Sequence, residues 1–358
     1  MADPSKVKEA VEWYSKTNAQ FEALARKVES IIRDVLDSRG VNYHSITSRA
    51  KSISRYREKA AKEKYRDPRS EIFDMAGIRV VTFTESEASI AHEIIKELFE
   101  LYPEHSVDKS EELGLDRVGY RSMHCVGTLG KERFELPEYQ VFRDMPFEIQ
   151  IRTILQHAWA EFGHERNFKF QGVLPDSVKR RFSIAAGTLE LVDKEFDKLA
   201  KEIELYSIRV ATRIGKGDLS IPINSKSLAA YMKRRFKTLV KEGLEEEHRS
   251  LDRTIIDELK DMGINTLEEL EGVIPKEYIP TRIKHKVEML SFGYIVRDIL
   301  MVHDMDAYFR KAWKKHWNGT DKSQLSFFKE FGIDFGKYGK KYDIQIGGVS
   351  YDPDSYMY

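Results

Sequence analysis

The chain has 358 residues, of which 41% are hydrophobic and 33% charged, and its 59 basic side chains balance 59 acidic ones. This length favours two domains, and the lack of net charge means that any nucleotide site depends on local clusters of charge. The single cysteine, Cys125, excludes a disulfide framework and a multi-cysteine metal site, and no apolar run resembles a signal peptide or a membrane span. A cytoplasmic protein that does not contact membranes is therefore expected.

Hydrophobic periodicity predicts alternating helices and strands in the first part of the chain. Apolar residues from Val7 to Val35 recur at helical spacing, and Gly40 is expected to end this helix. The next expected elements are a strand at 43–47, a basic helix at 52–66 ended by Asp67-Pro68, a strand at 78–83, a helix at 85–101, strands at 120–129 and 147–152, a helix from Thr153, and a long amphipathic helix at 176–206. This order indicates an α/β or α+β domain built around a central sheet.

The composition changes after residues 213–224, a segment with two glycines and a proline that is the best linker candidate. Residues 225–317 have almost wholly helical patterns, and the last forty residues are rich in glycine and tyrosine. The expected organisation is a first domain at 1–212 with its core at 40–170, a linker at 213–224, and a mostly helical domain at 225–358.

Asp74 and Arg79 flank the entry to the strand at 78–83, and Gly77 lies between them. A carboxylate at the mouth of a strand suits Mg²⁺, which takes few protein carboxylates together with phosphate oxygens. The glycine allows a ligand to approach the backbone closely. The alternative is a helix-capping aspartate and a surface arginine before an ordinary strand.

Strand alternation places Glu148, Gln150 and Arg152 on one polar face, because successive side chains of a strand point to opposite sides. A general base, a hydrogen-bonding amide and a phosphate-binding guanidinium can share such a face. A half-exposed strand with a polar outer side has the same pattern, so this motif alone leaves both interpretations open.

The strand at 120–129 groups Tyr120, Ser122 and His124 on one face. An aromatic ring there suits stacking on a base, and the histidine suits contact with phosphate or ribose. A core aromatic residue and a hydrogen-bonded histidine are the alternative. Basic residues gather at 49–66, where they suit a triphosphate or form a solvated helix face.

On the helix after the strand at 147–152, the spacing of His157, Glu161 and His164 places them on one face. This spacing is not the HExxH pattern of a zinc site, so a structural face packed near the site is favoured over a metal centre. The sequence also lacks a P-loop, a GxGxxG motif and a GxSxG motif.

These motifs follow one another in an order that resembles the synthetase domain of the RelA/SpoT alarmone synthetases. The resemblance covers residues 40–170 and rests on Arg49-x-Lys51-Ser52, Asp74-x-x-Gly77-Ile78-Arg79, Gly119-Tyr120-Arg121-Ser122-x-His124, Glu148-Ile149-Gln150-Ile151-Arg152-Thr153 and His157-Ala158-Trp159-Ala160-Glu161. It implies an α+β fold related to polymerase-β-type nucleotidyltransferases, with helices that flank a mixed sheet. It also implies an ATP-dependent pyrophosphokinase that moves the β,γ-pyrophosphate of ATP to the 3′-hydroxyl of GTP or GDP, with Mg²⁺ as the cofactor.

The same resemblance implies roles for individual residues. Asp74 and Glu148 resemble the Mg²⁺ ligands, Glu148 also resembles the acid that activates the acceptor hydroxyl, and Arg79 is expected to take part in catalysis. Contacts to ATP are implied for Arg49, Lys51, Ser52 and Arg79, and contacts to the acceptor for Tyr120, Ser122, His124, Gln150 and Arg152.

Two departures bear on the acceptor. The Pro-Lys pair that such synthetases often carry shortly before Gly119-Tyr120 is missing, and an extra C-terminal domain follows. What remains resembles the toxic small alarmone synthetases, some of which pyrophosphorylate the 3′ CCA end of tRNA and some of which carry a fused, antitoxin-like domain that senses phage. We therefore expect tRNA as the acceptor and a phage protein as a candidate trigger. A (p)ppGpp synthetase acting on GTP or GDP and an inactive nucleotide-binding regulator are the alternatives.

The expected C-terminal domain carries two further features. Basic and aromatic residues interleave at 311–317, after a basic group at 233–235, and such segments suit contact with tRNA or form an amphipathic helix face. Tyr356 and Tyr358 are expected to fold back on the ATP site and to stack in the place of the adenine, as an autoinhibitory contact. A disordered terminus is the alternative.

Overall fold

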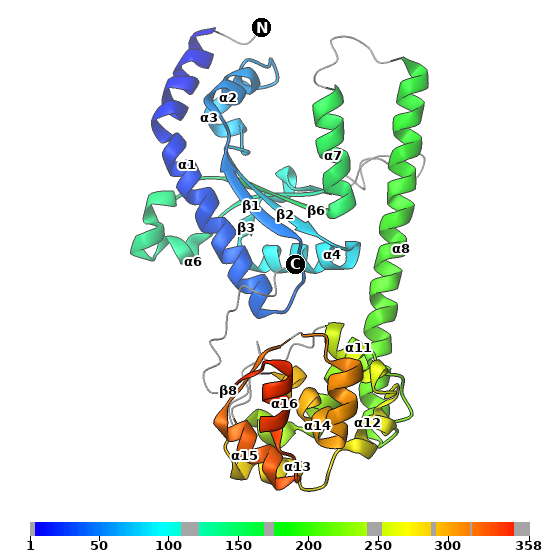
Figure 1. Ribbon diagram of the computed structural model, residues 1–358. Helices are drawn as coiled ribbons and strands as arrows, with labels where there is room; N and C mark the ends of the chain where they lie inside the picture. Colours follow the sequence, from blue (N-terminus) through cyan, green and yellow to red (C-terminus); the bar gives the residue numbers. More distant parts are fainter. Residues whose placement is uncertain are drawn as a thin grey trace. The chain divides into compact units, whose positions relative to one another are not determined.

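The computed structural model describes residues 4–108, 122–167, 175–241, 253–287, 291–315 and 317–346. The chain divides into two compact units, Met1–Glu202 and Ile203–Tyr358, and helix α8 (Asp176–Gly215) contributes to both (Figure 1). The boundary lies within this helix, before the segment 213–224 in which the sequence places a linker. Three residues of the expected site lie outside the described ranges: Tyr120, Tyr356 and Tyr358.

The described part of unit 1 contains a six-stranded mixed sheet with the strand order β1-β2-β6-β5-β3, and β4 pairs with β5. The central pair, β2 and β6, is parallel, and the other pairs are antiparallel. The strands are β1 (Ser45–Ala50), β2 (Ala76–Thr82), β3 (Glu100–Leu101), β4 (Val107–Asp108), β5 (Met123–Thr128) and β6 (Phe147–Thr153). Helices flank this sheet, so the expected α+β fold with a mixed sheet is confirmed (Figure 1).

The helices of unit 1 include three close to their expected positions, which begin at Pro4, Glu85 and Ile154, and two short ones, which begin at Pro68 and Lys131, that the sequence pattern does not predict. Their bounds are α1 (Pro4–Ser38), α2 (Ile53–Ala60), α3 (Pro68–Glu71), α4 (Glu85–Leu98), α6 (Lys131–Phe134), α7 (Ile154–Asn167) and the first part of α8, with 3₁₀ helices at Pro103–His105 and Pro137–Phe142. Gly40 follows α1 with a φ of 66°, which suits the glycine that commonly ends a helix.

The basic helix expected at 52–66 is shorter than predicted and ends at Ala60. Asp67-Pro68 begins a new helix, α3, instead of only ending the previous one. The Asp67 carboxylate accepts a hydrogen bond from the backbone N–H of Arg69 at 3.3 Å, and Pro68 occupies the first turn. Proline is favoured there because its missing N–H has no partner inside a helix at that position.

One face of the sheet belongs to the core of unit 1. Side chains at alternate positions of β2 and β6, such as Ile78, Val80, Ile149 and Ile151, are buried in one cluster with apolar residues of α1 and α4. Burying one such side chain stabilises the fold by about 1.5–3 kcal/mol. The intervening side chains of β2 and β6 therefore face the opposite side of the sheet, where α7 contacts both strands.

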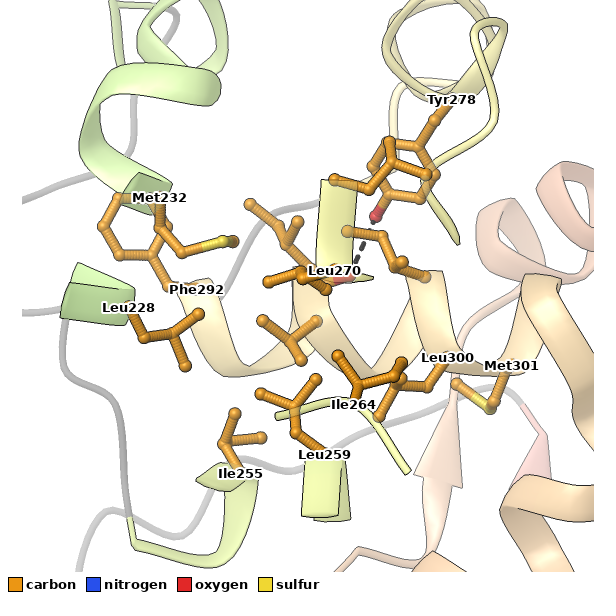
Figure 2. Packing of buried hydrophobic residues seen from close by; sticks show 14 of the residues in the cluster. Leu228, Met232, Ile255, Leu259, Ile264, Leu270, Tyr278, Phe292, Leu300 and Met301 are labelled. Atoms are coloured by element: carbon orange, nitrogen blue, oxygen red, sulfur yellow. Dashed lines mark hydrogen bonds between the residues drawn. The ribbon is translucent and has the colours of Figure 1, made fainter. Parts of the chain in front are cut away.

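Unit 2 is mostly helical in its described residues, as expected. Its bounds are the last part of α8, α9 (Ser225–Arg235), α10 (Lys237–Lys241), α11 (Arg253–Asp261), α12 (Leu267–Val273), α13 (Tyr278–Lys284), α14 (Phe292–Ala307), a π-helix at Tyr308–Ala312, β7 (Gly319–Thr320), α15 (Lys322–Glu330), α16 (Phe335–Tyr342) and β8 (Gln345–Ile346). Figure 2 shows the core, where Leu259 and Leu270 lie near the α14 side chains and Tyr278 donates a hydrogen bond to the Ile295 carbonyl oxygen at 3.2 Å. Ile221 and Ile223, from the expected linker segment, are buried in this core.

The basic and aromatic segment at 311–317 packs against the core of unit 2. Trp317 is buried and its indole N–H donates to the Tyr308 hydroxyl at 2.9 Å. The Trp313 N–H donates to the Trp317 carbonyl oxygen at 3.0 Å, and its ring packs against the same core. These contacts favour a core position over a platform for stacking on nucleic acid, but the helix ends at Ala312, so Trp313 and Trp317 do not belong to the expected amphipathic helix face. In the ranges given above, no helix is long and apolar enough to cross a membrane.

The first part of α8 is attached to unit 1 by two carboxylates. The Thr153 hydroxyl at the end of β6 donates to Asp193 Oδ2 at 2.7 Å, and the Ser86 N–H in the first turn of α4 donates to Asp197 Oδ1 at 2.9 Å. Burial raises the pKa of Asp193 to about 6. For Asp197, hydrogen bonds from Lys201 and Ser86 outweigh burial and lower the pKa. The pKa values of the two carboxylates are therefore shifted in opposite directions, and so are the effects of their ionisation on stability.

We expect Asp193→Asn to stabilise the protein at pH 7.5 by about 1–3 kcal/mol. The reason is that the unfolded chain releases the Asp193 proton near pH 4, whereas the folded chain holds it to about pH 6. The favourable contribution of Asp193 is therefore complete below pH 4 and is lost as the pH rises from 4 to 6. Urea unfolding at pH 7.5 and pH 4 measures the difference, which should vanish at the lower pH.

The matched control is Asp197→Asn, which removes a carboxylate of lowered pKa from the same helix. It should destabilise the protein at pH 7.5. An Asp193→Asn variant that is no more stable than the wild type at pH 7.5 would contradict the assignment.

Candidate active site

Two cavities lie beside the polar side of the sheet and share two carboxylates. The first cavity, of about 430 Å³, is lined by Thr47, Ser48, Arg49, Ala50, Lys51, Ser52, Arg55, Asp74, Gly77, Ile78, Arg79, Glu148 and Gln150. The second, of about 400 Å³, is lined by Lys59, Lys64, Tyr65, Ser70, Glu71, Phe73, Asp74, His105, Val126 and Glu148. Asp74 and Glu148 line both, so a group bound in one cavity lies next to a group bound in the other.

The strand register brings the site residues together from distant parts of the chain. One row across β1, β2 and β6 contains Arg49, Gly77 and Glu148. The next row contains Thr47, Arg79 and Gln150 and continues on β5 with His124. Because Gly77 has no side chain, the space between Arg49 and Glu148 above the sheet stays open. A Cβ added there would meet only the Arg49 carbonyl oxygen, at 3.8 Å.

Asp74 lies where the two cavities meet. Its Oδ2 is 2.8 Å from the Lys51 ammonium, which lines the first cavity, and 2.8 Å from the Lys59 ammonium, which lines the second. Burial lowers the pKa of Lys59, but the charge of Asp74 and its hydrogen bond raise that pKa above the usual value. Both lysines and the aspartate therefore form one charged cluster.

The second oxygen of Asp74 is available to a cation. Oδ1 is buried and accepts no hydrogen bond from the part of the chain that the structure describes. Such an oxygen suits a hard cation, and Mg²⁺ binds to one or two carboxylates plus water and phosphate oxygens. Within the described ranges, no group of three or more His, Cys, Asp and Glu could hold a metal. The residues present thus fit a metal whose coordination a phosphate ligand completes.

Glu148 is held in its ionised form by its neighbours. His124 Nδ1 lies 2.8 Å from Glu148 Oε1, the Gln150 side chain donates to Oε2 at 3.0 Å, and the Ser122 hydroxyl lies 2.8 Å from His124 Nε2. Burial alone raises the pKa of Glu148, but the hydrogen bonds and the charges of His124 and Lys59 lower it to about 2. The carboxylate is therefore charged at neutral pH and fixed in direction.

Arg79 connects the sheet with α7. Its Nη1 is 3.0 Å from Glu161 Oε1, and His157 Nδ1 lies 3.9 Å from the same oxygen. Burial and the nearby Arg79 lower the pKa of His157. The face shared by His157 and Glu161 thus contacts a cavity residue, in agreement with the interpretation of a structural face near the site.

The structure places most of the expected residues at the site. Arg49, Lys51, Ser52, Asp74, Arg79, Glu148 and Gln150 line the first cavity together. His124 and Ser122 reach this group through Glu148, and Arg152 follows on the same strand face without lining either cavity. Ser52 also begins α2, because its hydroxyl accepts from the Arg55 N–H at 3.3 Å.

The second cavity is the part of the site that sequence reasoning missed. Lys59 and Lys64 belong to the basic residues at 49–66, but Tyr65, Phe73 and His105 are not part of any motif recognised in the sequence. Phe73 and His105 lie with their ring centroids 4.3 Å apart and together form one wall. Phe73 adjoins Asp74 in sequence, and this proximity to a candidate metal ligand was the one available signal.

Residues 48–173 match the family described as "Region found in RelA / SpoT proteins". These matched residues are called the RelA/SpoT region below. Apart from Thr47, every residue that lines the two cavities falls within it. The helical unit 2 lies outside the RelA/SpoT region.

Several named proteins are similar to part of this chain. GTP pyrophosphokinase YjbM of Bacillus subtilis (strain 168) is 28% identical over 163 residues, which cover 44% of this chain and 72% of that protein. The probable GTP diphosphokinase RSH3, chloroplastic, of Oryza sativa subsp. japonica is 28% identical over 159 residues, or 44% of this chain but only 20% of that protein. The crystal structure of the small alarmone synthetase 1 from Bacillus subtilis has a TM-score of 0.44 and 21% identity, and the match covers 54% of this chain and 98% of that chain.

Proposed function

We propose that the protein is an ATP-dependent pyrophosphokinase, which transfers the β,γ-pyrophosphate of ATP to a ribose 3′-hydroxyl. The observation that carries this proposal is that Asp74 and Glu148 line both cavities. A transfer reaction needs donor and acceptor side by side, with the reacting atoms at the shared boundary. The names of the relatives, which are GTP pyrophosphokinases and diphosphokinases, agree with this chemistry.

The first cavity suits the donor. Arg49, Lys51, Arg55 and Arg79 line it, and it opens above Gly77. Guanidinium groups bind phosphate oxygens in pairs of parallel hydrogen bonds, and an ammonium adds a compact positive charge. Four cations match the charge of a triphosphate.

Mg²⁺ is the proposed cofactor, held by Asp74 and Glu148 at the boundary of the two cavities. When bound, it supplies charge neutralisation to the phosphate oxygens. Lys51 and Lys59 lie on either side of Asp74 and add positive charge where negative charge develops.

Glu148 is placed to receive the acceptor hydroxyl. The hydroxyl oxygen forms a bond with the β-phosphorus of ATP. The bond between this phosphorus and the α–β bridging oxygen breaks, and AMP leaves with that oxygen. The hydroxyl proton passes to the carboxylate. Because the pKa of Glu148 is about 2 before substrates bind, the group is a weak base, and its main contribution is to hold the hydroxyl in line.

The second cavity suits the acceptor nucleotide. Lys59 and Lys64 provide charge for phosphates, and Tyr65, Phe73 and His105 provide rings for a base or a ribose. The names of the relatives favour GTP or GDP as the acceptor. The resemblance to toxic small alarmone synthetases favours the 3′ end of tRNA, with the residues of the C-terminal unit as a restraint.

A transfer assay tests the function and selects the acceptor. The full chain is incubated with γ-labelled ATP, MgCl₂ and either GTP, GDP or bulk tRNA, and a variant without residues 351–358 is assayed beside it. Label in a guanine nucleotide or in tRNA identifies the acceptor, and AMP should appear in equal amount. A lack of label in every acceptor with both proteins would overturn the proposed function and favour the alternative of an inactive nucleotide-binding regulator. Equal transfer rates for the full chain and the shortened variant would contradict the proposed inhibition by Tyr356 and Tyr358.

Gly77→Val is expected to weaken ATP binding by about 1–3 kcal/mol, or roughly five- to 150-fold, because its methyl groups would enter the first cavity. The fold should persist, since a β-branched residue suits a strand and the nearest contact of the new Cβ is at 3.8 Å. Calorimetry with a non-hydrolysable ATP analogue measures the affinity, and thermal unfolding checks the fold. Gly77→Ala, with a smaller side chain, should have a smaller effect. Wild-type affinity in Gly77→Val would show that the nucleotide does not occupy this cavity.

A further inference from the structure

Two side chains of α1 contact the wall of the first cavity, although α1 precedes the RelA/SpoT region in sequence. The Tyr14 hydroxyl donates to the Lys51 carbonyl oxygen at 2.6 Å, and the Asn18 side-chain N–H donates to the same oxygen at 3.1 Å. This carbonyl lies directly after β1 and directly before Ser52, the residue that begins α2. Two donors thus converge on one backbone oxygen at the turn that lines the cavity.

The other polar groups of Lys51 are also held. Its backbone N–H donates to the Met75 carbonyl oxygen at 2.9 Å, and its ammonium lies 2.8 Å from Asp74 Oδ2. Lys51 is therefore fixed at its N–H and its ammonium by residues 74 and 75, and at its carbonyl by α1. Loss of the α1 donors would leave the peptide between Lys51 and Ser52 free to rotate and would leave a partly buried oxygen without a partner.

The contact belongs to a buried and ordered cluster. Tyr14 and Tyr56 are fully buried, and their rings stack with centroids 4.3 Å apart at an angle of 22°. The Tyr56 hydroxyl donates to the Pro68 carbonyl oxygen at 3.2 Å, which lies away from the cavity. Burial raises the pKa of Tyr14 to about 12, so its hydroxyl keeps its proton and remains a donor at any physiological pH.

We infer that Tyr14 and Asn18 are positioning residues for the pyrophosphate donor, which hold Lys51 in the direction that the phosphates of ATP require. The inference rests on the proposed function and deepens it, because it assigns part of donor binding to a helix outside the RelA/SpoT region. A buried tyrosine with only a structural role would stabilise the fold without a specific effect on the affinity for ATP.

The test compares Tyr14→Phe with Tyr56→Phe, since each removes one buried tyrosine hydroxyl from the same stacked pair. Tyr14→Phe is expected to raise the KM for ATP about tenfold and to leave the KM for the acceptor within about twofold of the wild type. Asn18→Ala should have a smaller effect in the same direction, and the double variant a larger one. Tyr56→Phe should lose a similar amount of thermal stability but keep both KM values.

A second measurement separates the inference from the proposed function. Calorimetry gives the affinity of each variant for a non-hydrolysable ATP analogue with MgCl₂, and Tyr14→Phe should bind about tenfold more weakly. If the wild type binds the analogue but transfers no label, the function is overturned, and the affinities still decide the role of Tyr14. Equal affinity and equal KM for ATP in Tyr14→Phe and the wild type would overturn the inference alone. Equal losses in Tyr14→Phe and Tyr56→Phe would overturn it as well.

Discussion

Asp74→Asn is expected to reduce pyrophosphate transfer by about 10³-fold or more while the protein remains folded. The substitution keeps the shape of the side chain but removes the negative charge where the two cavities meet. The buried Oδ1, which accepts no hydrogen bond from the described residues, would no longer attract a cation. Lys51 and Lys59 would lose their common partner and repel each other. Transfer of label from γ-labelled ATP, measured across a series of MgCl₂ concentrations, gives the rate.

Asp67→Asn is the matched control for this substitution. Asp67 begins α3, lines neither cavity, and can be replaced by asparagine, which caps helices equally well. Its activity should stay close to that of the wild type. If Asp74→Asn retained more than about a tenth of the wild-type rate, Asp74 would not be the metal ligand.

Glu148→Gln is expected to reduce transfer by about 10²-fold or more, because it removes the charge that holds the acceptor hydroxyl in line, one proposed Mg²⁺ ligand and a proton acceptor. Glutamine keeps the volume and one acceptor oxygen, but it cannot take a proton from the acceptor hydroxyl. The affinity for the ATP analogue should change less than the rate, because the first cavity keeps its four cations. The ratio of the two effects, measured by calorimetry and by single-turnover assay, separates a role in chemistry from a role in binding.

The stability of Glu148→Gln also has a predictable dependence on pH. Because the folded-state pKa of about 2 lies below the usual value, the ionised carboxylate stabilises the folded chain above about pH 4, and this contribution disappears as the pH falls towards 2. The variant should therefore be less stable than the wild type at pH 7. Glu87→Gln is the control, since Glu87 completes the capping box of α4 and glutamine can replace it there. If Glu148→Gln kept the wild-type turnover, Glu148 would have no role in the reaction.

Much of the fold and part of the site could be predicted from sequence, because they depend on local patterns. The alternation at 147–152 correctly separates the buried Ile149 and Ile151 from the polar Glu148 and Gln150. The helical periods of α1 and α8 were also recognised, although α8 extends to Gly215. Such periodicities arise from a single strand or helix and therefore require no knowledge of its neighbours.

The remaining features depend on contacts between distant segments. Sequence cannot give the parallel register that pairs Gly77 with Glu148, and this register decides which polar residues become neighbours. It also cannot indicate that Tyr14 reaches Lys51, or that Phe73 and His105 form a wall of the second cavity. The Trp317 ring was compatible with either a surface or a core position, and only the packing of unit 2 decided between them.

The central parallel pair of strands has a consequence for folding during synthesis of the chain. Asp74 and Glu148 are 74 positions apart, and β6 joins the sheet beside β2 only after both strands have been synthesised. Antiparallel β1 and β2 can form earlier, but Asp74, which lies just before β2, then has no Glu148 beside it. Pairing of such distant strands is slow relative to local structure. A nascent chain that ends before β6 therefore lacks the carboxylate pair, and the site within unit 1 cannot be complete until β6 has been synthesised.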